Sequence, residues 1–496
     1  MANRESIESF ESALCDPALA DIVELTARAL DDHSYRVACV DGAVEFSRSP
    51  RAGSWDYEVS AVTGRNPLGD QATDRFVGHL LERSALHPER TQNAYPHAYE
   101  SVAQFFDSPR APDLLVTHTA AHRVEEHLGQ HGSLGTVQAR APFLAAGAGI
   151  AELGTIDRST RVVNIAPTIA ALMGLEELPE AVGPTGEPIA GAFLRRQDGK
   201  PEREILDGTV AEHVVVFLLD GCNANLLADV IDSGEAPNMA GLLARGTMFG
   251  HGSMASLPTA TLANHTTAIT GAHPGHSGVL HNSWVDAASG EETDLLSIAE
   301  MFTAAQYLAP GVSTIFESVA RSRPGVFSVA TFEYCDRGAD FSSFELVRSG
   351  KQNSLPGISS VEHLAPRARP LRRPLRVHLA GGPPEHRPRA GVLGRHPRQP
   401  RPGPHLVQPR DHRRGRTPEQ PHGEAAARPC ALRRPHRRRP RGRRRRRGDR
   451  ADRFPRHRRP RHGAGAPRAG KDLGRRPGEP RDPYSEVGGG LLYLAD

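Results

Sequence analysis

Three polar residues stand where a buried strand is expected to end and a helix to begin. The apolar run at residues 214–219 is followed by Asp220 and is typical of a central parallel strand that delivers a side chain at its carboxyl end. Thr261 stands 41 residues further on, at the start of a helix expected over about 262–270, and Asn282 follows 21 residues later. Asp220 could instead cap the following helix, and Thr261 could be an N-cap residue, so each has a structural as well as a chemical interpretation.

The motifs around these residues resemble the type I phosphodiesterase/nucleotide pyrophosphatase branch of the alkaline phosphatase superfamily. That family's pattern is a strand ending in Asp-Gly, then Pro-x-x-Thr-x-x-Asn-His, then Thr-Gly-x-x-Pro-x-x-x-Gly and a later Asn, and it is matched at 214–221, 258–265, 270–278 and 282. The resemblance implies that Thr261 is the nucleophile, Asp220 a carboxylate ligand of the metal that activates it, and Asn282 a donor to a non-bridging phosphoryl oxygen. A threonine hydroxyl needs such a metal to lower its pKa before it can act as a nucleophile. A helix N-terminus favours binding of the phosphate anion that the threonine attacks. Asn264 and His265 are expected to support the helix start.

A second resemblance lies, in reversed order, within the first 200 residues. The superfamily's domain normally closes with a metal-binding His in a His-Gly turn, a returning strand and a helix beginning Ala-Pro-Thr; similar motifs stand at 113–118, 130–133, 139–143 and 166–170. We therefore predict a circular permutation, in which residues 1–200 supply the closing strands and His131 to the site of Asp220 and Thr261. His131 could also be an ordinary loop histidine. His118, His122 and His127 are expected to be solvated or to support the ligands.

The resemblance implies two divalent metal ions, most often zinc, held by three Asp and three His besides the nucleophile. Of these six ligands, Asp220 and His131 can be placed. The others are expected between the nucleophile region and the end of the chain, where an Arg- and Pro-rich segment stands instead. The activity of the chain as written is therefore in doubt.

Residues 366–483 divide the chain into two oppositely charged parts. They hold 36 Arg, one Lys, nine acidic residues and 22 of the 41 Pro, a net charge of +28, whereas the other 378 residues carry −25. Too few apolar side chains remain in this segment to offset the entropy lost on folding, so we expect disorder. We interpret the segment as a GC-rich gene translated out of frame between about residues 365 and 484. The alternative is a genuine basic tail that binds nucleic acid.

Hydrophobic periodicity predicts alternating helices and strands. Helices are expected at 17–30, 74–84, 166–173, 225–231, 239–244 and 262–270, and strands at 35–40, 113–117, 142–146, 214–219 and 488–494. The alternation predicts an α/β fold, which the resemblance makes an alkaline phosphatase-like sandwich with a mostly parallel central sheet flanked by helices. The expected parts are residues 1–200, 205–365, the low-complexity segment 366–483 and a strand-like end at 484–496.

The function predicted from these features is a metal-dependent phosphoric ester hydrolase that acts on a small phosphoester or nucleotide through a phosphothreonine-type intermediate. The alternative is a non-catalytic protein with a basic nucleic-acid-binding tail. No apolar run reaches 18 residues and the first residues lack the apolar core of a signal peptide, so no membrane span is expected and the cytoplasm is the default location. The five cysteines are scattered, which predicts packing residues and not a disulfide framework or a thiolate zinc site.

Overall fold

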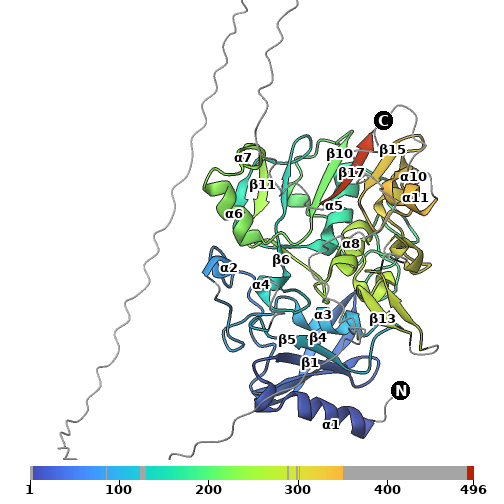
Figure 1. Ribbon diagram of the computed structural model, residues 1–496. Helices are drawn as coiled ribbons and strands as arrows, with labels where there is room; N and C mark the ends of the chain where they lie inside the picture. The colour runs from blue at the N-terminus through green and yellow to red at the C-terminus, as the bar shows by residue number, and fades with distance from the viewer. Residues whose placement is uncertain are drawn as a thin grey trace, which may run out of the picture. The chain divides into compact units, whose positions relative to one another are not determined.

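The computed structural model describes residues 4–84, 86–122, 130–286, 290–297, 300, 302–349 and 489–495 (Figure 1). All of these residues belong to one compact unit of the chain. The segment 366–483, for which disorder is expected, lies outside the described residues.

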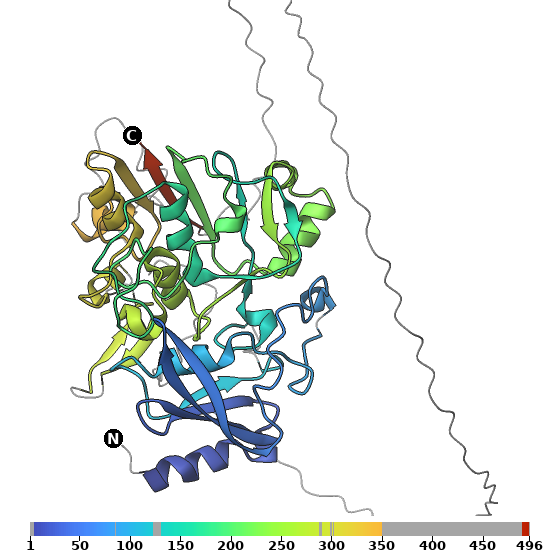
Figure 2. The same cartoon turned by 180° about the vertical axis from the view of Figure 1, so that it is seen from behind.

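A five-stranded antiparallel sheet forms the first part of the chain, in the order β4-β3-β2-β1-β5. Its strands are β1 (Val23–Ala29), β2 (Ser34–Cys39), β3 (Gly42–Arg51), β4 (Ser54–Gly64) and β5 (Leu115–His118). Tyr35 pairs with Phe46 across β2 and β3, and both side chains are buried in one core with helix α3 (Ala98–Phe105). Helix α1 (Arg4–Leu14) lies beside this sheet (Figure 2), where its Glu11 accepts hydrogen bonds from Arg28 and Arg36.

Two helices expected in this part are wrong or much shorter. Residues 17–19 form a short 3-10 helix, and the rest of the expected helix at 17–30 contains strand β1, whose pairing with β2 and β5 overrides the local helix propensity of its Leu and Ala residues. The helix expected at 74–84 is confined to α2 (Leu81–Ser84). Phe76 and Gly78 adopt left-handed backbone, with φ of 59° and 74°, and this conformation interrupts a helix.

Two small sheets combine strands from both halves of the chain. β11 lies between β7 and β8, and β12 lies between β6 and β9. In each sheet the middle strand is antiparallel to one neighbour and parallel to the other. The strands are β6 (Arg140–Ala141), β7 (Leu144–Ala146), β8 (Gly154–Ile156), β9 (Thr160–Arg161), β11 (Gly246–Phe249) and β12 (Ser253–Met254). A separate antiparallel pair is formed by β13 (Ser283–Val285) and β14 (Glu292–Asp294).

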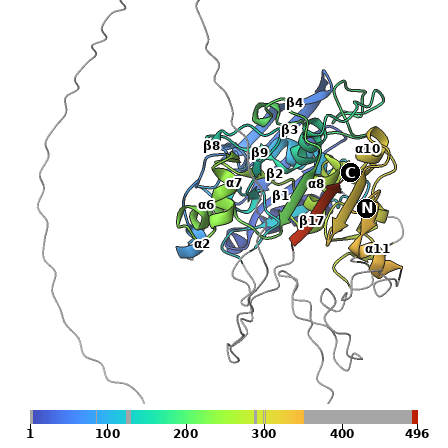
Figure 3. The same cartoon turned by 90° about the horizontal axis from the view of Figure 1, so that it is seen from above.

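The apolar strand β10 (Val214–Leu219) belongs to a four-stranded sheet of order β10-β17-β15-β16 (Figure 3). β17 (Gly489–Ala495) is antiparallel to both β10 and β15 (Phe327–Thr331), while β15 is parallel to β16 (Phe341–Ser342). The expected mostly parallel central sheet is therefore wrong for the described residues. Because β17 runs against both neighbours, β10 and β15 nevertheless point the same way, and their carboxyl ends lie at the same edge of the sheet.

β10 is also not the doubly covered central strand that its sequence predicts. Within the described part of the chain it has one strand neighbour, β17. Val214 is buried, but Val215 and Phe217 are 48% and 69% exposed, so one face of β10 is open to solvent there. An unbroken apolar run therefore does not distinguish a covered strand from one whose outer face lacks a partner.

Three helices pack together beside this sheet and form the largest core. Ile169 of α5 (Ile165–Leu172), Leu262 of α8 (Thr261–Thr270) and Ile315 of α10 (Ile315–Ser322) are buried in one cluster, which also contains Val214 and Ala330 of the sheet. The other helices are α4 (Thr136–Ala139), α6 (Ala224–Asp232), α7 (Pro237–Leu243), α9 (Pro274–Ser277) and α11 (Ser343–Arg348), with 3-10 helices at Pro17–Leu19, Val162–Asn164, Arg203–Ile205 and Ala304–Tyr307.

Most of the other expected elements are present. The strands expected at 35–40, 113–117, 142–146, 214–219 and 488–494 correspond to β2, β5, β7, β10 and β17, and the helices at 166–173, 225–231, 239–244 and 262–270 to α5, α6, α7 and α8. The four described cysteines are free thiols, as expected. Within the described residues, no helix combines the length and the apolar character needed to cross a membrane.

Candidate functional site

Thr261 is the first residue of α8, after the N-cap residue Ala260, which makes no side-chain cap bond. The turn before the helix is held by Asn264, whose Oδ1 accepts the Ser256 N–H at 2.8 Å and whose Nδ2 lies 2.9 Å from the Pro258 carbonyl oxygen. Asn264 therefore supports the start of the helix, as expected. The N-terminus of α8, with its positive dipole end, is suited to an anionic group beside Thr261.

Asp220 follows β10 and lies next to Thr261. The Thr261 Oγ1 is 3.5 Å from the Asp220 Oδ2, at the outer limit of a hydrogen bond. Asp220 does not cap the following helix α6, because Asn223 does so through bonds from the Asn225 and Leu226 amides at 2.9 and 3.3 Å. The exposed carboxylate of Asp220 is therefore not used by the helix and faces the hydroxyl of Thr261.

Asn282 is buried against the same helix start. Its Oδ1 accepts the Leu262 N–H at 3.0 Å, and the residue is 6% exposed. With Oδ1 used by α8, Nδ2 is the donor that the side chain retains. Asn282 is thus fixed beside Thr261 with an N–H group suited to an oxygen of a phosphoryl group.

The turn that carries His131 is fastened to the residues just before the nucleophile. Thr259 Oγ1 accepts the Gly132 N–H at 2.7 Å and donates to the Ser133 carbonyl at 3.0 Å. On its other side, Ser133 Oγ donates to the buried carboxylate of Glu24 in β1. A single threonine, two residues before Thr261, therefore ties the His-Gly turn of the first part of the chain to α8.

The pKa values of His131 and His281, two histidines near this turn, are shifted by their surroundings. Partial desolvation lowers the pKa of His131, the Asp220 carboxylate opposes this shift, and His118 adds to it. Desolvation also lowers the pKa of His281, with a further contribution from His131. Neutral imidazole is the form that binds a metal or donates one N–H to a substrate. His281 was not singled out from the sequence, although it directly precedes Asn282.

Both ring nitrogens of His118 contact backbone carbonyl groups in the same region. Its Nε2 lies 2.9 Å from the His131 carbonyl oxygen, and its Nδ1 lies 3.0 Å from the Thr119 carbonyl oxygen. His118 therefore supports the backbone of the His131 turn. His127 lies outside the described residues.

His265 has a role that the sequence did not indicate. Its Nδ1 lies 3.0 Å from Glu333 Oε2, so it pairs with the loop after β15 and not with the start of its own helix. Burial lowers the pKa of His265, but Glu333 and then Asp220 outweigh burial and raise it above the usual range. The two partners are 68 residues apart, and no local motif predicts their contact.

The Thr-Gly-x-x-Pro motif of residues 270–278 is structural in this chain. His276 Nδ1 lies 2.6 Å from Asp198, and its Nε2 lies 2.8 Å from Asp107, which also binds Arg48. Burial lowers the pKa of His276, but these carboxylates raise it above its ordinary range, so the ring is a buried cation between two anions. The motif thereby anchors α9 to the first part of the chain.

The structure brings together Asp220, Thr261 and Asn282, and it attaches the turn of His131 to the same helix start. Among the described residues, however, no group of three or more His, Cys, Asp and Glu side chains is placed to hold a metal ion. Asp220 and His131 offer the oxygen and nitrogen ligand types that zinc accepts. They do not by themselves fit the two-metal centre that the resemblance implies.

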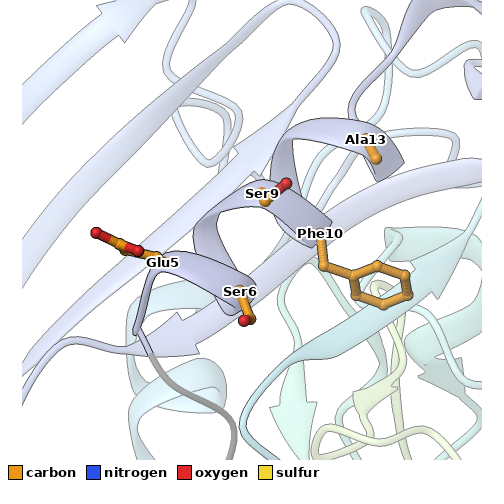
Figure 4. A pocket seen from close by; sticks show the side chains of 5 residues that line it. All are labelled: Glu5, Ser6, Ser9, Phe10 and Ala13. Atoms are coloured by element: carbon orange, nitrogen blue, oxygen red, sulfur yellow. The ribbon is translucent and has the colours of Figure 1, made fainter.

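An open surface hollow over α1 is not part of this site. It is lined by Glu5, Ser6, Ser9, Phe10 and Ala13, all on one face of the helix (Figure 4). Among the residues that the structure describes, no group of metal-ligating side chains accompanies it, so we assign it no function.

The placement of these residues can be compared with known families. Residues 214–341 match the family model of Type I phosphodiesterase / nucleotide pyrophosphatase. The resemblance predicted from the sequence is confirmed for this phosphodiesterase segment, which contains Asp220, Thr261 and Asn282. His131 lies outside it, so the circular permutation remains a prediction. No curated protein and no solved structure matches the chain. At the level of the family, the match supports a hydrolase of phosphoric esters.

Proposed function

We propose that the protein is a metal-dependent phosphoric ester hydrolase of the phosphodiesterase/nucleotide pyrophosphatase type, with Thr261 as its nucleophile. The observation that carries the proposal is the position of Thr261, at the first residue of α8 with Oγ1 3.5 Å from the Asp220 carboxylate, inside the phosphodiesterase segment. The proposed substrate is a small phosphoester or nucleotide.

The proposed reaction consists of two displacements at phosphorus. Thr261 Oγ1 forms a bond to phosphorus, the bond to the leaving oxygen breaks, and the hydroxyl proton is lost to solvent. Water then attacks the phosphothreonine, the bond between phosphorus and Oγ1 breaks, and Thr261 regains a proton. In both displacements Asn282 Nδ2 and the Thr261 amide at the start of α8 would donate hydrogen bonds to the non-bridging oxygens, since the Leu262 amide is already bound by Asn282 Oδ1.

Asp220 and His131 are the proposed metal ligands in this chain. A bound zinc ion would lower the pKa of a coordinated hydroxyl group. The remaining ligands are proposed to be encoded in the adjacent reading frame across 366–483, since the described part of the chain does not complete the set. Asp220 contacts Thr261 directly, whereas His131 is connected to it through Thr259.

Hydrolysis of bis-p-nitrophenyl phosphate in the presence of zinc or manganese, by the protein with its reading frame restored across 366–483, tests the proposal. Thr261→Ala is expected to lower the rate by more than about a hundredfold, because the attacking oxygen is removed. Thr261→Ser keeps an oxygen at that position and is the matched control, so it should retain part of the activity. Metal content should be similar in both variants because the carboxylate and imidazole ligands remain.

Two outcomes would contradict the proposal. Activity of Thr261→Ala at more than a few per cent of the unsubstituted protein would show that a metal-bound hydroxide is the nucleophile. A chain that binds no zinc and hydrolyses no phosphoester, both as it stands and with the reading frame restored across 366–483, would favour the non-catalytic alternative.

A further inference from the structure

A buried histidine lies one turn along α8 from the proposed nucleophile. His265 is 4% exposed and stands four positions after Thr261, which places both on the same side of the helix. Its Nδ1 is 3.0 Å from Glu333 Oε2, and Glu333 is itself 3% exposed and accepts the Cys335 N–H at 2.8 Å through Oε1. One edge of the ring is therefore fixed by a buried carboxylate that is itself held by the backbone.

The other edge of the ring has no partner within the part of the chain that the structure describes. His265 Nε2 is buried and has no hydrogen-bond partner among the described residues. Buried polar atoms are usually paired, since an unpaired one loses its hydration without compensation. The edge-on contact with Tyr334, whose ring centroid is 5.4 Å away, is an aromatic contact and leaves Nε2 unpaired.

Asp220 is the acidic residue nearby that could satisfy this atom. Its described hydrogen bond is the 3.5 Å contact with Thr261, which lies one turn along α8 from His265, and Asp220 is exposed. In agreement with this position, the Asp220 charge contributes to the electrostatic environment of both His265 and Tyr334. Strands β10 and β15 end at the same edge of their sheet, so the loops that carry Asp220 and Glu333 leave the sheet at that edge.

The chain contains a completed example of this arrangement. His276 lies between two carboxylates, with Nδ1 2.6 Å from Asp198 and Nε2 2.8 Å from Asp107. His265 has the first carboxylate in place and the second one close by. The same chemistry, a ring that donates both N–H groups to carboxylates, is thus already used elsewhere in this core.

We propose that His265, fixed by Glu333, is a positioning residue whose Nε2–H binds the Asp220 carboxylate and sets its orientation toward Thr261. The inference deepens the proposed function, because Asp220 is the carboxylate assigned there to the metal. His265 acts through Asp220 and touches neither the substrate nor the phosphoryl group. The bond concerns side chains of the metal-free protein, so it can be tested independently of catalysis.

A double-mutant cycle in chelator tests the proposal. The unfolding equilibrium is measured for the unsubstituted chain, Asp220→Asn, His265→Gln and the double variant. We expect the two substitutions to be non-additive by about three- to tenfold in the equilibrium constant, as for residues in direct contact. The matched control is Asp157→Asn, which removes an exposed carboxylate that binds His251 and should be additive with His265→Gln.

Nuclear magnetic resonance provides a readout that does not require a change at His265. In chain labelled with ¹⁵N-histidine, the His265 Nε2–H resonance should be observed and should shift in Asp220→Asn but not in Asp157→Asn. Additivity within twofold in the cycle, or an Nε2 resonance unchanged by Asp220→Asn, would overturn the proposal. Both measurements are made without metal or substrate, so failure of the proposed hydrolysis would leave their outcome unaffected.

Discussion

His276 shows how a single side chain can stabilise the contact between two distant parts of the chain. The side chain is 7% exposed and lies between Asp198, which is fully buried, and Asp107, which also binds Arg48. Burial alone would raise the pKa of Asp107 and Asp198, but the His276 ring and neighbouring arginines outweigh it and lower the pKa of both carboxylates. Removing one member of such a buried set leaves the others unpaired, which costs more than losing an exposed ion pair.

His276→Gln should destabilise the protein, and the loss should depend on pH. The folded pKa of His276 is raised above 6.5, so its contribution is complete below that pH and is lost as the pH rises through the folded pKa. The folded pKa of each carboxylate is below 3.8, so their contribution is lost as the pH falls through those values. We expect a loss of about 3 kcal/mol in the free energy of unfolding between these limits, measured by urea denaturation.

The control for this prediction is His79→Gln, which changes an exposed histidine beside Phe76. Its effect on the free energy of unfolding should be small throughout the same pH range. If the loss caused by His276→Gln were equally large at pH 6 and at pH 9, the ring would not act as a cation in this network.

At the scale of elements, α8 depends on its attachment to the turn of residues 131–133. Thr259 is 7% exposed and makes two hydrogen bonds to that turn through one hydroxyl group. Because Thr259 stands two residues before Thr261, movement of the turn would alter the position of His131 relative to Thr261. This attachment is the local feature on which a shared site would depend.

Thr259→Val is expected to destabilise the protein by roughly 1 to 3 kcal/mol, because it keeps the shape of the side chain and removes the hydroxyl that binds the Gly132 amide and the buried Ser133 carbonyl. Hydrogen exchange at the Gly132 amide, which donates to Thr259 Oγ1, should become faster. Thr259→Ser retains the hydroxyl and should preserve most of the protection. Equal Gly132 exchange in the Val and Ser variants would show that the turn is held by other contacts.

The elements that could be predicted from sequence are those defined by local pattern. The apolar run of β10 and the start of α8 are where the sequence places them, and the loop motif around Asn264 explains why Thr261 is presented at a helix N-terminus. β1 was mistaken for a helix because its partners β2 and β5 decide its conformation. The pairing of His265 with Glu333 joins residues 68 positions apart, which no single-sequence pattern encodes.

At the scale of the whole molecule, the first 200 residues and the following part share their interior. Leu257 and Leu280 are buried in the core of the N-terminal sheet, while Ala166 and Ile169 belong to the core around α8. Gln104 adds two buried hydrogen bonds, to the Leu257 carbonyl and from the Gly275 amide, each 2.9 Å long. The boundary near residue 200 is therefore a division in the sequence and not a division of the core.

A cut between the two parts should leave them associated. An engineered protease site in the exposed segment 207–210 would break the chain while leaving both cores intact, together with the two small sheets β7-β11-β8 and β6-β12-β9. After cleavage, the fragments should co-elute in size-exclusion chromatography and separate in denaturant. Two separate peaks in native buffer would show that each part folds alone, and would remove the basis for a permuted domain with one site.

The last prediction concerns the segment 366–483 and two incomplete features of the described structure, the exposed face of β10 and the metal site. β10 leaves Val215 and Phe217 48% and 69% exposed, and the described residues do not complete a metal site. Both features are expected if the family's missing strands and ligands are encoded in this part of the gene but translated in another frame. The 36 Arg and 22 Pro of the segment favour GC-rich codons read out of frame over a core-forming sequence.

Translation of an adjacent frame across residues 366–483 should therefore yield alternating apolar strands and helices, with paired Asp and His residues that include Asp-His-Gly. The nucleotide sequence around codons 360–370 and 480–488 should contain the two compensating shifts. A protein expressed from the restored frame should bind zinc and should protect β10 amides from hydrogen exchange more strongly than the chain as it stands, since a covered strand opens less often. If every other frame contained stop codons or were equally rich in Arg and Pro, the basic segment would be genuine, and the exposed face of β10 would need another explanation.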